Sequence, residues 1–433
     1  MFSLKTSVWQ CATFEEFAGK AGLGAGDLVI TQSFLYEPYM KGLGLECKFV
    51  LQDRYGAGEP SDEMIARILD DLRAEGPGGA AVAGGAAGIG VAERPGSAPA
   101  DGFKRIVGIG GGTVIDIAKL FVLKGLEDPE AAYLREMPIV KGRELVIVPT
   151  TCGTGSEVTN ISIAELKRKH TKLGLADNAI LPDEAVLIPE LLKGLPFKFY
   201  VYSAIDALIH AAESYVSPKA TPHSRLFSEA AIHTILEVFG GIVERGEDYR
   251  FERLEDMLVA ANMAGIAFGN AGCGPVHALS YPLGGNYHVP HGESNYQFFT
   301  HIFKLYSECR PEGRIADLNR LFAKELGPAG DVPAAAVYDA KELGPAGDVP
   351  AAAVYDALEP GPAEDVPAAA VYDALEQRLG SLIARRKLRE YGMTQEEVRT
   401  FAAQVFASQQ RLLANTYIPM PEEQIAAIYA ALW

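Results

Sequence analysis

The chain of 433 residues has few cysteines, and no two of them form a CxxC pair. Its five thiols are scattered and odd in number, which argues against a disulfide framework and a cysteine-based zinc site and suits a reducing compartment. Long hydrophobic runs are missing as well. Because a transmembrane helix needs about 18 or more apolar residues in succession, the sequence predicts no membrane span.

Basic charge is also scarce: 39 Lys and Arg stand against 56 Asp and Glu, for a formal net charge of −17. Binding to a polyanion needs clustered Lys and Arg, so we expect neither a nucleic acid nor a membrane surface as partner. The start of the chain lacks the order of basic, apolar and small residues that marks a secretory signal. We therefore expect a cytoplasmic protein that acts on a small molecule.

The first half of the chain alternates short apolar runs with a helical pattern. Strands are predicted at 27–31, 48–51, 105–109 and 144–148. A helix is predicted over 61–74, with Ser61 as its N-cap. This alternation is typical of βαβ units that build a mostly parallel sheet with helices on its faces.

The second half changes character at about residue 196. Amphipathic helices are predicted at 203–215, 224–243 and 252–268, with no convincing strands between them. The sequence therefore predicts an α/β domain over 1–195 and an all-α domain over 196–433.

Two segments interrupt this plan. Residues 76–102 are rich in Gly, Ala and Pro and have almost no large apolar side chains, which predicts a flexible surface insertion. Within 324–376, the run DVPAAAVYDA begins three times, at Asp331, Asp348 and Asp365. These units are shorter than known solenoid repeats, so they indicate a recent tandem duplication, or an error in the sequence, inside one helix–loop element.

A glycine-rich run, GIGGGTVIDIAK from Gly108 to Lys119, follows one predicted strand and opens a helical pattern. Glycines there let the backbone approach a diphosphate closely, and the N–H groups of a helix N-terminus favour anions. The spacing is not the GxGxxG of the dinucleotide fingerprint. From these residues alone, a phosphate site and a plain tight turn are equal alternatives.

The loop after the next predicted strand, Pro149 to Thr159, is rich in glycine and hydroxyl groups. Open α/β sheets bind ligands outside the carboxyl ends of their strands. A polar loop with a helix cap near Ser156 is the simpler interpretation, but two adjacent loops of this kind favour nucleotide binding.

Asp206 and His210 stand four residues apart in a predicted helix, so their side chains share one face. A later segment carries His277, His288 and His291. One carboxylate with several imidazoles suits a cation such as Fe²⁺ or Zn²⁺, whereas all-oxygen ligation suits Mg²⁺ or Ca²⁺. A solvated Asp–His contact and a structural role for His288 are the alternatives.

Four runs in this order resemble the group III, iron-containing alcohol dehydrogenases: GGGTVIDIAK, PTTCGTGSE, DALIHAAESYVS and HALSYPLGGNYHVPHGE. Connecting segments such as QSFLYEPYMKG and QQRLLANTYI are most similar to the branch of the family that acts on 4-hydroxybutyrate. The resemblance covers nearly the whole chain except the insertion and the extra repeat copies. It implies a dinucleotide-binding α/β domain, a helical domain, and a metal in the cleft between them.

By position, the resemblance implies a divalent metal, Fe²⁺ or Zn²⁺, held by Asp206, His210, His277 and His291. It implies an NAD cofactor near Gly110, Gly111, Gly112, Thr113, Asp116, Thr150, Thr151, Thr154, Ser156 and Lys172. The implied reaction is hydride transfer that interconverts 4-hydroxybutyrate and succinate semialdehyde, in a homodimer. A primary alcohol or diol dehydrogenase of the same family is the main alternative, and a lyase of the dehydroquinate synthase type is a more distant one.

Two positions depart from the family pattern. Many members have a histidine four residues after the third ligand, which helps to relay the alcohol proton; this chain has Tyr281 there, a poorer base at neutral pH. The acid that often bonds the cofactor ribose is absent from 31–33, so the preference for NAD over NADP rests on the subfamily resemblance. His288 is a candidate partner of the substrate carboxylate, because it lies three residues before His291.

Deleting residues 78–99, or one copy of the 17-residue repeat unit, is expected to change kcat/KM by less than about tenfold. Long surface loops cost little free energy, and neither segment holds a candidate ligand. Steady-state kinetics on the two deletion variants check this expectation. A loss of several orders of magnitude in correctly folded protein would show that one of the segments serves as a functional lid.

Overall fold

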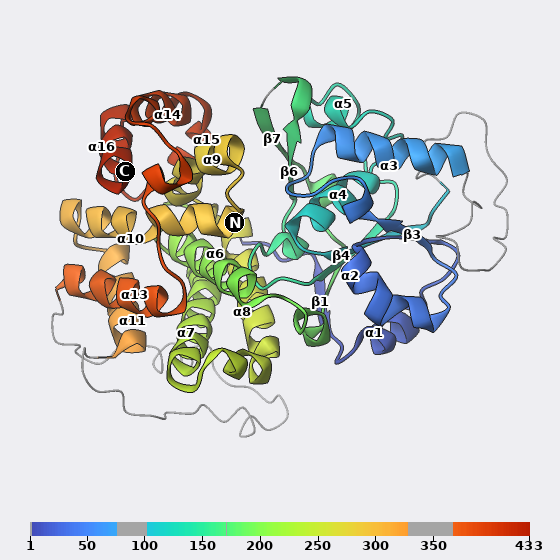
Figure 1. Cartoon of the computed structure of the whole chain (residues 1–433), viewed down its shortest axis with the longest axis horizontal. Helices are drawn as coiled ribbons and strands as arrows, with labels where there is room; N and C mark the ends of the chain where they lie inside the picture. The colour runs from blue at the N-terminus through green and yellow to red at the C-terminus, as the bar shows by residue number, and fades with distance from the viewer. Residues whose placement is uncertain (1, 76–101, 170, 328–366) are drawn as a thin grey trace.

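The computed structural model describes residues 2–75, 102–169, 171–327 and 367–433. The predicted insertion, apart from Gly102, lies outside these residues, and so do the repeat copies between 328 and 366. Two halves stand side by side: a sheet with helices on both faces, and a bundle of helices (Figure 1).

Six parallel strands form the sheet, in the order β1-β8-β5-β4-β2-β3. Their bounds are β1 (Ser7–Gln10), β2 (Asp27–Thr31), β3 (Lys48–Leu51), β4 (Arg105–Gly110), β5 (Glu144–Pro149) and β8 (Glu184–Leu187). The four strands expected from the sequence are all present, and the mostly parallel sheet is confirmed. The register pairs Gly110 with Pro149, so β4 and β5 end together and their following loops are neighbours.

Helices cover both faces because alternate strand residues point to opposite sides. Leu28 and Ile30 of β2 pack into a core with α3 (Asp62–Glu75), α4 (Gly112–Phe121) and α5 (Pro129–Tyr133). Val29, between them, packs into a second core with α1 (Phe14–Ala21). The predicted N-cap is confirmed, since the Met64 N–H donates to Ser61 Oγ over 3.2 Å at the start of α3.

An antiparallel hairpin of β6 (Ile161–Leu166) and β7 (Thr171–Ala176) stands apart from the main sheet. This hairpin and the strands β1 and β8 were not predicted from the sequence. The hairpin's β6 strand runs beside α4, so that Asp116 Oδ2 accepts a hydrogen bond of 2.9 Å from the Ile163 N–H.

The second half of the described chain is helical and holds no strand. Its helices are α6 (Phe197–Val216), α7 (Pro222–Arg245), α8 (Leu254–Ala271), α9 (Pro275–Tyr287), α10 (His291–Cys309), α11 (Arg314–Leu326), α13 (Ala368–Leu382), α14 (Gln395–Ser408), α15 (Gln410–Leu413) and α16 (Glu422–Leu432). The three predicted helices correspond to α6, α7 and α8. Among the described helices, α7 is long and apolar enough to cross a membrane, and α8 with α9 passes the same test but bends by 107°. Buried residues of α7 such as Ile235 and Phe239 belong to the same core as those of α6 and α8.

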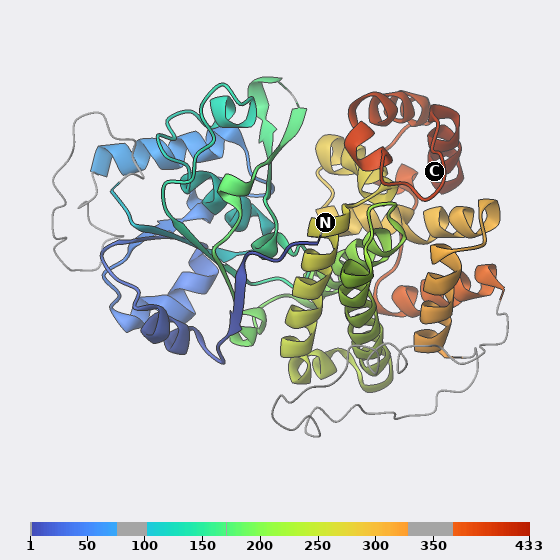
Figure 2. The ribbon, with the colours of Figure 1, turned by 180° about the vertical axis from the view of Figure 1, so that it is seen from behind.

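The two halves meet where the loop after β5 presses against helices α6 and α8. A Cβ added to Gly265 of α8 would lie 2.7 Å from Gly155 Cα, so the two backbones touch. Glu157, two residues after Gly155, accepts a buried hydrogen bond of 2.8 Å from Asn262. The N-terminal segment adds a second link, because it crosses to the helical half and bonds Asn270 through the Ser3 N–H (Figure 2).

Gly265→Ala is expected to destabilise the protein by about 1–3 kcal/mol, because its methyl group would have to displace backbone rather than a flexible side chain. Gly269→Ala, one turn later on the same helix, is the matched control. Its methyl group meets nothing closer than 3.5 Å, and Ala favours a helix by about 1 kcal/mol over Gly. Urea unfolding of both variants measures the difference; equal stability changes would contradict the close contact.

Candidate active site

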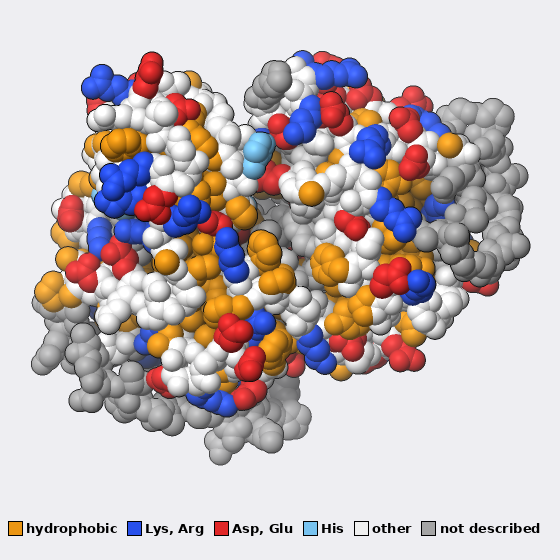
Figure 3. Space-filling model, viewed as in Figure 1, with side chains coloured by type: hydrophobic (Ala, Val, Ile, Leu, Met, Phe, Trp, Pro, Cys, Tyr) orange, Lys and Arg blue, Asp and Glu red, His pale blue; other side chains and the backbone are white. Residues whose placement is uncertain are grey.

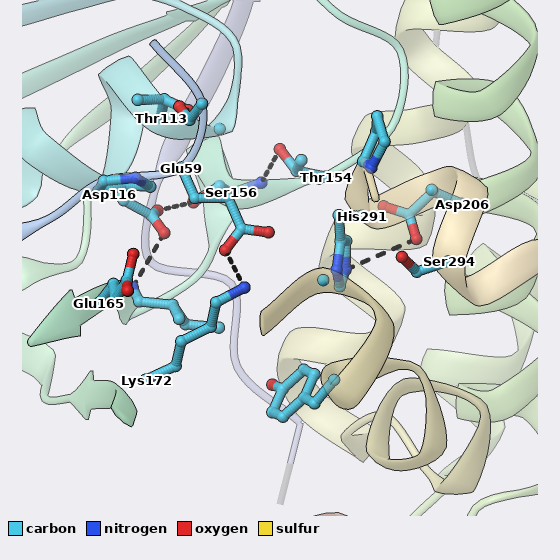
Figure 4. Close-up of a pocket in the computed structure, with 18 of the residues that line it drawn as sticks. Glu59, Thr113, Asp116, Thr154, Ser156, Glu165, Lys172, Asp206, His291 and Ser294 are labelled. Carbon is cyan, nitrogen blue, oxygen red and sulfur yellow. Dashed lines mark hydrogen bonds and ion pairs between the residues drawn. The ribbon is translucent and has the colours of Figure 1, made fainter. Parts of the chain in front are cut away.

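A cavity of about 950 Å³ lies between the two halves, and the space-filling view shows the molecule hollowed there (Figure 3). One wall consists of the loop at 55–61, the start of α4, the loop after β5 and the β6–β7 hairpin. The facing wall consists of residues from α6, α8, α9, α10 and α15 and from the loops that lead into α9 and α10. The close-up shows Thr113, Asp116 and Lys172 on the sheet side and Asp206 and His291 on the helical side (Figure 4).

Four side chains of the helical wall converge in a tight cluster. Asp206 and His210 share a face of α6, His277 lies on α9, and His291 is the first residue of α10. Each offers one donor atom, and these four atoms lie within 4.8 Å of one another. The structure thus brings together all four residues to which the resemblance assigns a metal.

Burial and charge shift the pKa values of the cluster in different directions: Glu213 and Asp206 outweigh burial and raise the pKa of His277, whereas burial favours the neutral, electron-donating form of the other two imidazoles. Burial lowers the pKa of the His210 imidazole to about 3, against the opposing effect of Asp206, and burial also lowers the pKa of His291. Burial alone would raise the pKa of Asp206, but the three imidazoles outweigh it and lower that pKa. His291, with 37% of its side chain exposed, is the most open of the four and faces the cavity.

Glu213 orients the cluster, although sequence reasoning does not single it out. Its carboxylate accepts a hydrogen bond of 2.6 Å from His277 Nδ1 and two more from the Gly274 and Val276 N–H groups. This contact orients the His277 ring, so that its Nε2 edge is turned toward the cluster. Glu213 follows His210 by three residues, and this spacing keeps both side chains near one face of α6. That spacing is the feature of the sequence from which Glu213 could have been identified.

The donor set fits a transition-metal cation. His277 Nε2 lies 2.9 Å from His210 Nε2, so two ring nitrogens face each other in a buried site. The Asn295 amide also points inward and donates to Asp206 Oδ1 over 2.7 Å. Three imidazoles and a carboxylate, with a hydrogen-bonded outer layer, are ligands that suit Fe²⁺ or Zn²⁺.

The glycine-rich run of the sheet wall divides into two parts. Gly112 and Thr113, at the N-terminus of α4, line the cavity, whereas Gly110 and Gly111 are not among its lining residues. A Cβ on Gly110 would lie 2.7 Å from Val114 Cβ, so this glycine allows the strand to pack against α4. Thr113 Oγ1 donates to the Gly58 carbonyl over 2.9 Å.

The loop after β5 is held by a buried polar network. Ser156 Oγ donates to Asp116 Oδ1 over 2.9 Å and accepts from the fully buried Lys119 Nζ over 2.6 Å. Burial lowers the pKa of Lys119 to about 8. Ser156 and Asp116 line the cavity, but their polar atoms already bond within the protein, which fixes the loop against α4. Of the three threonines predicted to bind the cofactor, Thr151 and Thr154 line the cavity and Thr150 does not; Thr159, at the end of the loop, lines it as well.

The three remaining predicted residues also line the cavity. Lys172 of β7 pairs with Glu59. Tyr281 lies one turn after His277 on α9, and burial raises the pKa of its phenol to about 12. His288 is exposed and ends α9 in the left-handed conformation, at φ +53°. Arg411 of α15, which the sequence analysis does not single out, lines the cavity too.

Comparison with known proteins decides the family. A model described as "Fe-containing alcohol dehydrogenase family, C-terminal" matches residues 200–343 and 351–433, and one described as "Iron-containing alcohol dehydrogenase" matches residues 96–189. The chain belongs to the iron-containing alcohol dehydrogenase family. This confirms the resemblance seen in the sequence.

The chain is similar to several named members of the family. It is 44% identical to the 4-hydroxybutyrate dehydrogenase of Clostridium kluyveri over 433 residues, which covers 100% of both chains. It is 40% identical to long-chain-alcohol dehydrogenase 1 of Geobacillus thermodenitrificans over 198 residues, 45% of this chain and 49% of that one.

Solved structures share the fold at lower identity. A 1,3-propanediol oxidoreductase superimposes with a TM-score of 0.73 at 20% identity and covers 100% of both chains. The sulfoacetaldehyde reductase of Bifidobacterium kashiwanohense, crystallised with NAD⁺, superimposes with a TM-score of 0.71 at 16% identity and covers 100% of this chain and 98% of that one. The expected architecture, an α/β half followed by a helical half, is confirmed.

His277→Ala and His291→Ala are each expected to lower metal content and turnover severely while leaving the fold intact, because a catalytic metal need not hold a domain together. Glu213→Gln is expected to weaken metal affinity about 10–100-fold, since it removes the carboxylate that orients His277. Elemental analysis and circular dichroism test this.

The matched control is His233→Ala, an exposed histidine of α7 that pairs with Glu325 outside the cavity. This variant is expected to retain wild-type metal content. Undiminished metal in either cluster variant, or equal loss in the control, would contradict the assignment.

Proposed function

We propose that the protein is a metal-dependent oxidoreductase that interconverts 4-hydroxybutyrate and succinate semialdehyde with NAD. The observation that carries the proposal is the placement of the Asp206, His210, His277 and His291 cluster directly across one cavity from the strand-end loops. The full-length similarity to a protein named 4-hydroxybutyrate dehydrogenase supports the choice of substrate.

In this proposal the four cluster residues hold Fe²⁺ or Zn²⁺, and the sheet wall holds NAD. Gly112, Thr113, Thr151 and Thr154 offer backbone N–H and hydroxyl groups beside the diphosphate, with Lys172 nearby. Five other predicted residues support this wall, because they shape the strand ends or fix the loop: Gly110, Gly111, Asp116, Thr150 and Ser156. When bound, the cation supplies Lewis acidity at the alcohol oxygen and the nicotinamide supplies a two-electron acceptor.

The chain's own residues position the reactants and control protons. The alcohol loses two electrons and two hydrogens overall, one with the electron pair to NAD and one as a proton to water. Tyr281 keeps its phenolic hydrogen at neutral pH, because burial raises its pKa to about 12. We therefore infer that Tyr281 Oη donates a hydrogen bond in the cavity and does not accept the alcohol proton.

We further propose a homodimeric, cytoplasmic enzyme whose two domains divide near residue 195. The family models end at 189 and begin again at 200, on either side of that position. Cys11, Cys47, Cys152 and Cys273 are buried free thiols, which is consistent with a reducing compartment.

The substrate proposal predicts faster turnover of 4-hydroxybutyrate than of 1-butanol, a matched alcohol without the carboxylate. NADH formation followed at 340 nm should give a kcat/KM at least about tenfold higher for the hydroxy acid, because a charge-assisted hydrogen bond contributes about 1.5–3 kcal/mol. Removal of the metal by a chelator should abolish both activities, and added Fe²⁺ or Zn²⁺ should restore them. A preference for 1-butanol would point to the primary alcohol alternative instead.

A further inference from the structure

A hydroxy-acid substrate carries an anion that the described cavity must receive despite the acidic chain. In extended 4-hydroxybutyrate, the carboxylate carbon lies roughly 4–5 Å from the carbinol carbon. The carboxylate therefore needs hydrogen-bond donors or a cation in the wall of the same cavity, a short distance beyond the metal cluster. Four Lys or Arg side chains line the cavity: Arg67, Lys167, Lys172 and Arg411.

Three of these four cations are engaged on the sheet side. Lys167 pairs with Glu165 over 2.6 Å, and Lys172 pairs with Glu59. Arg67 donates to the Tyr55 carbonyl over 2.7 Å. Arg411 is different: within the described chain its guanidinium has no ion pair, and it comes from the helical half.

The segment that carries Arg411 is tied to the loop before α9 by Asn415, four residues later in the chain. Asn415 Nδ2 donates to the Cys273 carbonyl over 2.8 Å, in the loop that leads into α9 and its ligand His277. Asn415 lies in the turn that follows α15, where its N–H donates to the Leu412 carbonyl over 2.9 Å. Its Nδ2 also donates to the Arg411 carbonyl over 3.5 Å, so the backbone of Arg411 stands beside the loop that leads into α9.

Arg411 lines the same cavity as Cys273, His277 and Tyr281, and its charge acts on two of these residues. Burial raises the pKa of the Tyr281 phenol, and the positive charge of Arg411 is the main opposing influence. The Cys273 thiol shows the same pattern, with burial raising its pKa and Arg411 lowering it. The field of Arg411 therefore reaches both residues that flank His277 in the cavity wall.

We propose that Arg411 binds the carboxylate of the substrate and so selects hydroxy acids over uncharged alcohols. This inference rests on the proposed function and names the group that recognises its substrate. A guanidinium is charged at every relevant pH and binds a carboxylate through two parallel hydrogen bonds. His288, the partner considered from sequence, is charged only when protonated.

Arg411→Met tests the proposal, with Arg399→Met as control, an exposed arginine of α14 that does not line the cavity. Arg411→Met should lower kcat/KM for 4-hydroxybutyrate about 10–100-fold and leave 1-butanol within about threefold. Arg411→Lys should recover part of the loss, because it keeps the charge without the bidentate geometry. Arg399→Met should change neither substrate.

Butyrate binding separates this inference from the proposed function. Butyrate carries the carboxylate without the reacting hydroxyl, and its Kd for the metal-loaded enzyme with NADH can be measured by calorimetry whatever the enzyme oxidises. Arg411→Met should raise that Kd about 10–100-fold without changing the Kd of NADH. An unchanged butyrate Kd overturns the role of Arg411, even if 4-hydroxybutyrate is the substrate.

Other outcomes also overturn the inference. Equal losses on 4-hydroxybutyrate and 1-butanol would make Arg411 a structural residue, and a raised Kd for NADH would make it a cofactor contact. A selective loss in His288→Ala but not in Arg411→Met would assign the carboxylate to His288. If wild-type enzyme prefers 1-butanol while its butyrate Kd still depends on Arg411, the proposed substrate fails and the anion site stands.

Discussion

The arrangement of the active site depends on one steric constraint: two backbones that touch without side chains between them. Gly155, in the loop after β5, lies against Gly265 of α8, and neighbouring Gly153 lies against the backbone of Ser203 in α6. Any larger residue would push the strand-end loop away from the helices. The contact therefore sets how far the sheet wall stands from the metal cluster, and the Glu157–Asn262 hydrogen bond holds that spacing.

The cluster itself depends on a second layer of polar contacts that removes freedom from its members. Glu213 orients the ring of His277, and the Asn295 amide donates to Asp206. Both partners are buried, so these bonds form in a medium of low dielectric where they are strong and directional. The sheet side of the site is also held by buried polar contacts, because Lys119, Ser156 and Asp116 bond one another and keep the loop backbone rigid.

Much of this could be predicted from sequence because the relevant signals are local. Strands buried on both faces read as continuous apolar runs, and the Asp206–His210 spacing places both side chains on one helix face. β1 escaped prediction because it is an edge strand with mostly exposed residues, and so lacks such a run. Glu213 was missed because its contacts are with Gly274, Val276 and His277, which lie far along the chain, and Arg411 was missed because only the fold places it in the cavity wall. The Gly155–Gly265 approach is likewise invisible without the fold.

All four residues of the described cluster belong to the helical half, and the sheet half contributes none of them. In the proposed enzyme, the cation and NAD would therefore remain bound for different lengths of time. A cation enclosed by α6, α9 and α10 can stay through many catalytic cycles, while NAD is exchanged in each cycle from the opposite wall. Release of the reduced cofactor then requires no rearrangement of the imidazoles, and the ion is not lost with it.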